Sequence, residues 1–250
     1  MDLYGYIKTV QLDVPKNVTT DYPFNIPSLQ HFKKIDIHPK VTYLIGENGM
    51  GKSTLLEAIA INLGFNAEGG SKNFNFETRA SHSNLHDYLK ISKGVQKMRD
   101  GFFLRSESFY NLATEIDCRD AETETNLGRP IIDSYGGKSL HKLSHGESFW
   151  ALFMNRFTGS GLYILDEPES ALSAMRQMAM LTQMDKLINK RSQFIISTHS
   201  PILLAYPDAT IYQMTPEGID KVMYEDSDIY RLYKTFLDNP EQMTSILLDD

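Results

Sequence analysis

The sequence has little cysteine, no long apolar run and no excess of positive charge. Cys118 is its single cysteine, which excludes an intramolecular disulfide framework and fits a reducing cytosol. No uninterrupted apolar stretch approaches the ~18 residues of a membrane-spanning helix, and the N-terminal segment carries Asp2, Lys8, Asp13 and Lys16. We therefore expect a cytoplasmic protein with no direct insertion into a membrane. Internal repeats and low-complexity tracts are also missing, which excludes a repeat architecture.

The charge balance is acidic. A formal net charge of −7 makes the whole molecule repel a polyanion, so the composition does not indicate nucleic acid as a partner. One basic cluster could still face a polyanion, or could be an ordinary solvated surface: Lys90, Lys93, Lys97 and Arg99. With 250 residues, of which 41% are hydrophobic, the chain can bury a substantial core, and we expect a single domain over residues 1–250.

The N-terminal part predicts strands and then a helix. Apolar and polar residues alternate, with Pro and Asn breaks between them, in LYGYIKTVQL, YPFNIPSL, KKIDIH and VTYLIG. After Ser53, apolar residues recur at helical spacing as far as Leu63. This spacing predicts a helix with one buried face and a C-terminal stop at Gly64.

The middle of the chain is polar from Asn66 to Gly101. We expect a surface insertion there, with a helix near His86 to Met98, inside a helical subdomain at about residues 66–160. Three segments share one design, a short apolar run followed by acids or hydroxyls: GFFLRSESF, GLYILDEPES and SQFIISTHSP. Chemistry at the ends of buried strands is typical of α/β proteins, so we predict that fold class. The C-terminal part predicts strands at ATIYQM and DKVMYE and helices in DIYRLYKTFLD and PEQMTSILLD.

A glycine-rich segment follows the strand VTYLIG and opens the expected helix. Residues 46–53 read GENGMGKS and match G-x-x-x-x-G-K-[ST] in the context that this motif requires. Its glycines let backbone N–H groups surround phosphates, Lys52 is expected to reach the β- and γ-phosphates, and Ser53 to bind Mg²⁺. The alternative is a glycine-rich turn without a ligand. The candidate phosphate-binding residues are Gly46, Glu47, Asn48, Gly49, Met50, Gly51, Lys52, Ser53 and Thr54.

A nucleoside triphosphate site also needs a second metal ligand and a group that positions water. Asp166 ends a buried apolar run and is the expected magnesium ligand, and the adjacent Glu167 is the candidate general base. His199 ends another apolar run, where it could contact the γ-phosphate or hold the water. Alternatively, the two acids only start a turn before Pro168, and His199 is a hydrogen-bonded structural residue.

A third polar segment, KLSHGESFWALF at residues 142–153, stands before an apolar and aromatic helix. Ser144, Gly146 and Glu147 would direct hydroxyl and backbone N–H groups at an anion. Taken alone, this segment would be interpreted as a plain helix cap.

The Ser144 segment resembles the LSGGQ or LSGGE signature of ATP-binding-cassette (ABC) ATPases. The glycine loop at Gly46, the Ser144 segment, Asp166–Glu167 and His199 follow one another in the order of that superfamily, and the resemblance covers most of the chain. It implies an ABC-type P-loop ATPase head: an α/β fold with a mixed or parallel core sheet, an antiparallel N-terminal β part and a helical signature subdomain. It also implies ATP and Mg²⁺ as ligands and an ATP-dependent homodimer, in which two protomers hold two ATP molecules between one subunit's phosphate loop and the other's Ser144 segment.

Within the superfamily, the chain is closer to the DNA-repair and chromosome-maintenance branch than to the transporters. The segments FFLRSESF, SHGESF, LDEPESALS and THSPILLAYP look most like small stand-alone bacterial ATPases, often described as AAA-family proteins. The stretch between Ser53 and Ser144 is too short for the long coiled-coil arms of chromosome-maintenance proteins.

Three departures from the ABC pattern concern the site. His145 replaces the usual glycine after the signature serine, and Ser173 stands where the loop after the acids normally has aspartate. No glutamine marks the expected metal-sensing loop, so Glu107 is the substitute candidate for a metal ligand and Arg105 a candidate phosphate contact. Either could instead have a surface or ion-pair role. The aromatic that many relatives stack on adenine stays open among Tyr22, Phe24 and Phe32.

Three functions compete on these grounds. The first is an ATP hydrolase whose ATP-driven dimerisation switches a partner effector, such as a nuclease or toxin, or a nucleic-acid transaction. The second is the nucleotide-binding subunit of a membrane transporter, against which the residues after Ser148 count. The third is a non-hydrolysing ATP-sensing module. Glu167 argues against the third, because a base beside the metal has no evident use without water activation.

Overall fold

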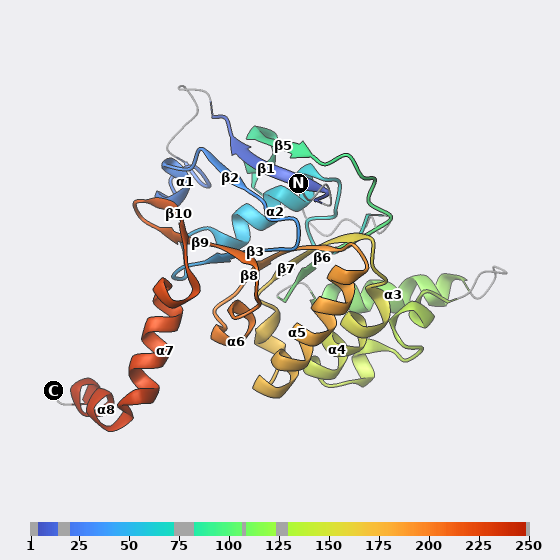
Figure 1. The fold of residues 1–250 in the computed structure, drawn as a ribbon. Helices are drawn as coiled ribbons and strands as arrows, with labels where there is room; N and C mark the ends of the chain where they lie inside the picture. The colour runs from blue at the N-terminus through green and yellow to red at the C-terminus, as the bar shows by residue number, and fades with distance from the viewer. Residues whose placement is uncertain (1–4, 15–20, 73–82, 107–108, 124–129, 249–250) are drawn as a thin grey trace.

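The computed structural model describes residues 5–14, 21–72, 83–106, 109–123 and 130–248. A mixed sheet of seven strands, in the order β10-β9-β3-β8-β7-β6-β4, runs through the centre of the molecule (Figure 1). The strands are β3 (Val41–Ile45), β4 (Gly70–Ser71), β6 (Asp100–Arg105), β7 (Gly161–Asp166), β8 (Gln193–Ser197), β9 (Ala209–Thr215) and β10 (Gly218–Val222). The five strands from β9 to β6 are parallel, and β10 and β4 are antiparallel to their neighbours. Every residue of β3, β7 and β8 is buried, as expected for parallel strands covered on both faces.

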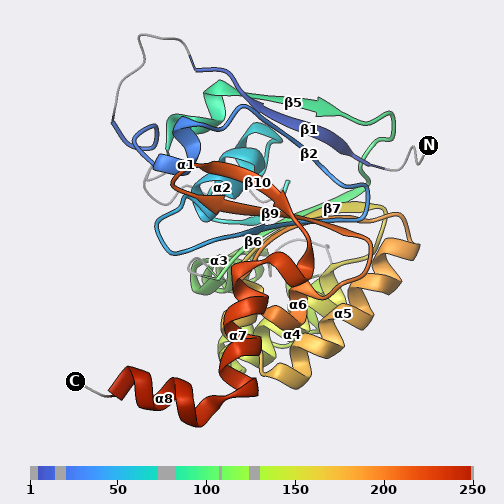
Figure 2. The ribbon, with the colours of Figure 1, turned by 60° about the vertical axis from the view of Figure 1, so that its left-hand side comes forward.

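A second sheet is antiparallel and lies above the first. Its order is β2-β1-β5, with β1 (Ile7–Leu12), β2 (Lys34–Asp36) and β5 (Leu89–Lys93). Helix α2 (Lys52–Asn62) lies between the two sheets (Figure 2). Its residues Leu55, Leu56 and Ile59 belong to one buried cluster together with residues from both sheets. A helix covered on two sides is buried around most of its circumference, which differs from the single buried face that the sequence predicts.

Helices cover the opposite face of the core sheet. They are α3 (Phe109–Thr123), α4 (His145–Arg156), α5 (Ala174–Asn189) and α6 (Pro201–Leu204), with the 3₁₀ turns η2 (Ile131–Tyr135) and η3 (Leu140–Lys142) between α3 and α4. The buried rings Phe149, Phe153 and Phe157 pack here. Arg156 forms an ion pair of 2.8 Å with Asp100 on β6, whose carboxylate also accepts a hydrogen bond from the Tyr163 hydroxyl. The C-terminal end of α4 is thereby fixed to β6 and β7.

The predicted fold class is confirmed, because the core sheet is mixed, the N-terminal sheet is antiparallel and a helical layer contains the Ser144 segment. Two predictions for single segments are wrong. The residues from His86 to Met98 do not form a helix: the 3₁₀ turn η1 (Asn84–Tyr88) leads into β5, which pairs with β1. The segment YPFNIPSL is a turn and the short helix α1 (Pro27–Gln30), since Pro27 at the first helical position suits a helix start.

The last described residues form an arm that extends away from the body (Figures 1 and 2). It consists of the 3₁₀ turn η5 (Tyr224–Asp226), α7 (Asp228–Asp238) and α8 (Pro240–Leu248), in agreement with the two predicted helices. At its base, Gln213 Nε2 donates to Asp228 Oδ2 and the Asp228 N–H donates to Gln213 Oε1. Within the described ranges, no helix has both the length and the apolar character needed to cross a membrane.

Gln193 connects the two sheets. Its side chain is fully buried, and its Oε1 accepts the backbone N–H groups of Tyr6 and Ile7 at 2.8 and 3.1 Å. Its Nε2 donates to the carbonyls of Ile7 and His38, both at 2.9 Å. One amide therefore satisfies four buried or partly buried backbone groups from segments that are far apart in the sequence.

We expect Gln193→Ala to lower the free energy of unfolding by about 3 kcal/mol, because buried backbone groups lose their partners. Urea unfolding followed by circular dichroism measures the change. Gln11→Ala on β1 is the matched control, since Gln11 is exposed, and its effect should be small. Equal stability of the two variants would contradict the role of Gln193.

Candidate functional site

Four strands of the core sheet end at one edge. The glycine-rich segment follows β3, Ser106 follows β6, Asp166 ends β7 and His199 lies just after β8. The register places Ser197 of β8 beside both Leu44 of β3 and Asp166 of β7. Parallel strands present their carboxyl ends on the same side, so the fold gathers the chemical groups that the sequence distributes along the chain.

The loop from Gly46 to Gly51 requires its glycines. All three of Gly46, Gly49 and Gly51 have positive φ, at 143°, 82° and 84°. A Cβ atom on Gly46 would lie 2.3 Å from the Met214 carbonyl oxygen, so no other residue fits there without a shift of the backbone. The left-handed Gly51 directly precedes α2 and turns its N-terminal N–H groups toward the loop.

Lys52 lies inside this loop. Its ammonium group donates to the carbonyl oxygens of Gly46 and Glu47 at 2.8 and 3.1 Å. Burial lowers the pKa of Lys52, and the carboxylates of Glu167 and Asp166 oppose this effect. A cation held by only two carbonyls in this concave loop is well placed to interact with an anion.

Asp166 joins three elements. Its Oδ1 accepts hydrogen bonds from Ser53 Oγ at 3.0 Å and from Ser197 Oγ at 2.5 Å, and its own carbonyl accepts one from Ser106 Oγ at 3.0 Å. Burial raises the pKa of Asp166, although the bonds from Ser197 and Ser53 act in the opposite direction. A hydroxyl and a carboxylate 3.0 Å apart beside a phosphate-type loop are oxygen donors of the kind that Mg²⁺ binds.

Glu167 faces His199. Its backbone is left-handed, with φ 48° and ψ 54°, and its N–H donates to Ser197 Oγ at 3.0 Å. Its Oε1 lies 3.5 Å from His199 Nε2. Burial, and after it the nearby Lys52, lowers the pKa of His199, so the imidazole is neutral at neutral pH. A carboxylate held in a strained conformation beside a neutral imidazole is a suitable arrangement for orienting a water molecule.

Glu169 is a site residue that sequence reasoning missed. Its carboxylate accepts the backbone N–H of His199 at 2.5 Å, and burial raises its pKa. Glu169 thus fixes the loop that carries His199, while Glu167 faces the ring of the same residue. The signal was present as a third acid in the segment DEPES, but a surface position two residues after Glu167 explains it equally well in sequence.

The Ser144 segment is a helix cap with an exposed front. Ser144 accepts the Glu147 N–H, and the Glu147 carboxylate accepts the N–H and hydroxyl of Ser144, which completes a capping box on α4. The hydrogen bond from the Ser144 hydroxyl lowers the pKa of Glu147. A Cβ on Gly146 would lie 2.5 Å from the Ala171 carbonyl, so this glycine lets α4 approach the turn η4 (Pro168–Ala171) after the acids. In the described part of the chain, no hydrogen bond or ion pair joins this segment to the residue 46–53 loop.

The two departures in this region have clear local roles. His145 lies edge-on to Phe109, with ring centroids 5.6 Å apart, and Ser173 caps α5 by accepting the Arg176 N–H. One turn later, Gln177 donates to the Leu172 carbonyl and accepts from Ser200 Oγ at 2.6 Å. The segment before Ser173 is therefore tied through α5 to the loop of His199.

The proposed metal-sensing residue, Glu107, lies outside the described residues. Arg105 forms an ion pair of 2.5 Å with Glu57 on α2 and donates to the Ala67 carbonyl. Its guanidinium thus has the structural ion-pair role that the sequence left as an alternative.

Among the three aromatic candidates for adenine stacking, Phe32 is buried in the core and Phe24 packs edge-on against Tyr88. Tyr22 is exposed, and its hydroxyl lies 3.2 Å from Thr54 Oγ1, next to the loop.

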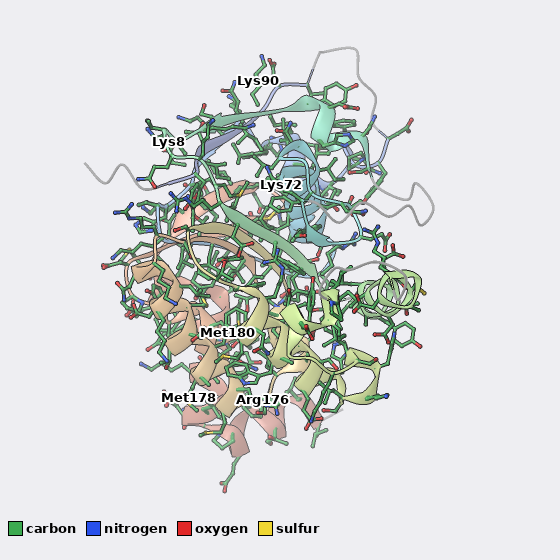
Figure 3. All side chains as sticks on the ribbon, turned by 90° about the vertical axis from the view of Figure 1, so that its right-hand side faces the viewer. Lys8, Lys72, Lys90, Arg176, Met178 and Met180 are labelled. Carbon is green, nitrogen blue, oxygen red and sulfur yellow. The ribbon has the colours of Figure 1, made fainter. Side chains whose placement is uncertain are left out.

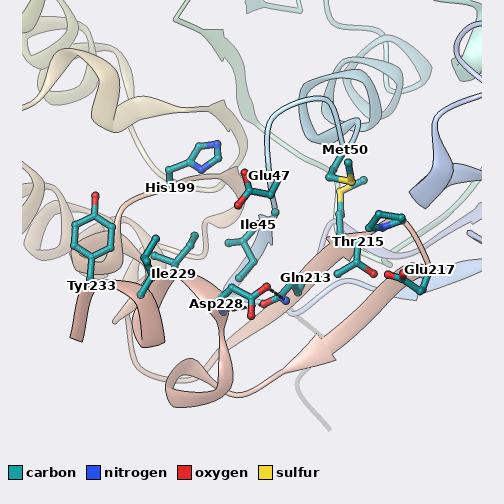
Figure 4. A pocket seen from close by; sticks show the side chains of 14 residues that line it. Ile45, Glu47, Met50, His199, Gln213, Thr215, Glu217, Asp228, Ile229 and Tyr233 are labelled. Carbon is teal, nitrogen blue, oxygen red and sulfur yellow. Dashed lines mark hydrogen bonds between the residues drawn. The ribbon is translucent and has the colours of Figure 1, made fainter. Parts of the chain in front are cut away.

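A cavity of about 710 Å³ adjoins the loop (Figure 4). Glu47 and His199 line it on one side, and Gln213, Asp228 and Tyr233 line it on the other. The side chains of α7 therefore reach a space that is continuous with the phosphate-loop region.

Two family models match consecutive parts of the chain. The first, described as an AAA domain, matches residues 24–136. The second, described as "AAA domain, putative AbiEii toxin, Type IV TA system", matches residues 139–205. No curated protein matches the chain significantly.

Solved structures share the fold at low sequence identity. An SMC head bound to the C-terminal winged-helix domain of ScpA is 14% identical, over 87% of this chain and 97% of that chain, with a TM-score of 0.51. A bacterial Atm1-family ABC exporter with ATP bound is 18% identical, over 92% of this chain and 42% of the exporter chain, with a TM-score of 0.52. The likeness to these two structures shows that the chain has the fold of SMC heads and ABC-type ATPases. The two AAA-domain matches agree with this fold.

Burial makes Asp166 a candidate for a trade-off between stability and function. Because its pKa is raised in the folded protein, its contribution to stability is fully present below the ordinary aspartate pKa of about 4 and is lost as the pH rises through the folded pKa. We expect Asp166→Asn, which keeps an oxygen acceptor but removes the buried charge, to melt at a higher temperature than the ligand-free wild type at neutral pH. The difference should shrink as the pH falls toward about 4. Scanning calorimetry measures the two melting temperatures at each pH. An Asp166→Asn variant that melts lower than the wild type at neutral pH would contradict the inference that burial of the charged Asp166 carboxylate destabilises the fold.

Proposed function

We propose that this protein binds and hydrolyses Mg-ATP. The observation that carries the proposal is the 3.0 Å hydrogen bond from Ser53 Oγ to Asp166 Oδ1, which joins the glycine-rich loop to the carboxylate at the end of β7. The loop N–H groups and Lys52 would bind the phosphates, Ser53 and Asp166 would hold the metal, and Tyr22, next to the loop, would contact the adenine. Mg²⁺ bound there would neutralise charge on the phosphates.

Glu167 acts as the general base in this proposal. Its left-handed backbone and the Ser197 hydroxyl hold it at the open edge of the sheet, where its carboxylate can accept a proton from the attacking water. His199 is neutral and can accept or donate one hydrogen bond to that water or to the γ-phosphate. Glu169 positions His199 through the backbone N–H.

The second half of each ATP site comes from another copy of the chain. Ser144 and Gly146 stand at the exposed start of α4 and make their hydrogen bonds locally, so their hydroxyl and N–H groups can face a nucleotide held by a partner. A head-to-tail pair would then enclose two ATP molecules and switch an effector protein or a nucleic-acid transaction as it opens and closes.

The cluster Lys90, Lys93, Lys97 and Arg99 offers little support for nucleic acid as a partner, because Lys90 pairs with Asp13. Lys8, Lys72 and Lys90 all lie on the half of the molecule that carries the antiparallel sheet (Figure 3).

Replacement of Glu167 by Gln separates a hydrolase from a sensor. The amide keeps the size of the side chain but cannot accept the proton, so we expect phosphate release to fall by roughly 10²-fold or more. ATP binding should survive, and the variant should accumulate as an ATP-bound dimer. Two controls should lose binding instead: Lys52→Ala should lose ATP binding, and Asp166→Asn should lose the magnesium-dependent part of ATP binding. Wild-type turnover in Glu167→Gln would disprove the base assignment and favour a sensor.

Replacement of Ser144 by Arg tests the sandwich. The long side chain would occupy the position facing the partner's γ-phosphate, so we expect normal ATP binding by the monomer and no ATP-dependent dimer in sedimentation velocity. Ser144→Ala is the comparison, because it removes the helix cap, which costs about 1 kcal/mol, and the hydroxyl without adding bulk, so it should weaken the dimer less than Ser144→Arg does. An undiminished dimer in Ser144→Arg would count against two-subunit sites.

A further inference from the structure

The α7 surface is apolar and uncovered. Its apolar residues Leu232, Tyr233, Phe236 and Leu237 recur at helical spacing, a pattern that normally marks a buried face. Their exposed fractions are nevertheless 62%, 48%, 40% and 70%, in that order. Leu232 and Tyr233 also line the cavity beside the phosphate loop. We call the cavity together with these four residues the arm surface. It is thus continuous with the site at Glu47 and His199.

The arm surface is acidic as well as apolar. Glu47, Glu217 and Asp228 line the cavity, and none of its described lining residues is Lys or Arg. The two cations of α7 are engaged with groups of the arm itself: Arg231 forms an ion pair of 2.6 Å with Asp226, and Lys234 lies over the Tyr230 ring. The arm surface is therefore suited to a partner that is both basic and apolar.

The end of the molecule that carries Ser144 has the complementary chemistry. His141 and Lys142 stand exposed just before Ser144, and the Lys142 ammonium makes no hydrogen bond or ion pair within the described chain. Arg176 lies next to Gly146, 3.3 Å from a Cβ built there. Two exposed methionines, Met175 and Met178, lie near Arg176 on α5, where Figure 3 shows Arg176 and Met178 on one helix. Flexible methionines adapt readily to an apolar partner surface.

We propose that the arm surface of one copy receives the Ser144 end of a second copy, with Lys142 of the second copy facing the acidic groups around Glu217. This inference rests on the two-subunit ATP site proposed above and names a contact that this site alone does not require. The apolar stripe supplies buried area, and the opposite charges set the orientation of the two chains. Closure of the pair would then cover α7 whenever ATP is enclosed.

The test uses the full-length Glu167→Gln protein with Mg-ATP, in which the dimer accumulates. We expect an added Leu232→Glu to raise the dimer dissociation constant by roughly a hundredfold, because a charge enters the stripe at both contacts. Lys142→Glu and Glu217→Lys should each raise it by roughly tenfold, and the combination of both should restore most of the affinity. Val95→Glu is the matched control, since Val95 is also an exposed apolar residue but lies between β5 and β6, outside the arm surface.

Two failures are distinguishable. If the Glu167→Gln protein stays monomeric with Mg-ATP, the two-subunit site is wrong and the arm contact with it. If it dimerises and Leu232→Glu dimerises as tightly, only the arm contact is wrong, and α7 belongs to another partner. A disulfide between Glu217→Cys on one chain and Lys142→Cys on another, in a Cys118→Ser background, should form with ATP and not without it. Cross-linking at equal rates in both states would also overturn the proposal.

Discussion

One carboxylate holds the site together. Asp166 accepts the hydroxyl of Ser53 from the start of α2 and that of Ser197 from the end of β8, so a helix and two strands meet on a single oxygen. Its carbonyl and that of Glu167 accept Ser106 Oγ from the end of β6. A displacement of any one of these elements would change the geometry of Ser53 and Asp166, the two proposed magnesium ligands. Burial raises the pKa of this carboxyl, and a bound cation would favour its charged form instead.

The order of the motifs and their positions at strand ends could be predicted from sequence, because glycine loops and apolar runs have short-range signatures. The loop, Asp166, Glu167 and His199 accordingly lie together in the structure, whereas their chemical roles stay predictions. Glu169 could not be identified in this way, since its role depends on a bond to a residue thirty positions later. Likewise the sequence predicts a helix where η1 and β5 form, because the pairing of β5 with β1 is tertiary information that outweighs local propensity.

The arm shows a different limit of sequence reasoning. Apolar spacing in DIYRLYKTFLD predicts α7 correctly. Such spacing normally accompanies a covered helix face, yet Leu232 and Leu237 are exposed in the part of the chain that the structure describes. Apolar periodicity indicates that a helix face is normally covered, but it does not identify the surface that covers it. The structure places two residues of this face, Leu232 and Tyr233, in the same cavity lining as Glu47 and His199. The contacts of Gln177 with Leu172 and Ser200 similarly link loops that look independent in sequence.

The amide of Gln193 also has a consequence for how the protein is made. The side chain that satisfies the backbone groups of Tyr6 and Ile7 leaves the ribosome long after them, at a separation of 187 positions from Tyr6. Central strand β3 likewise waits for β8 and β9, its two neighbours in the sheet. Strand β1 can pair with β2 and β5 before that point, but the core sheet that carries the glycine-rich loop stays incomplete until β8 and β9 are synthesised. This favours late folding of the core sheet and protection of the nascent chain by chaperones until then.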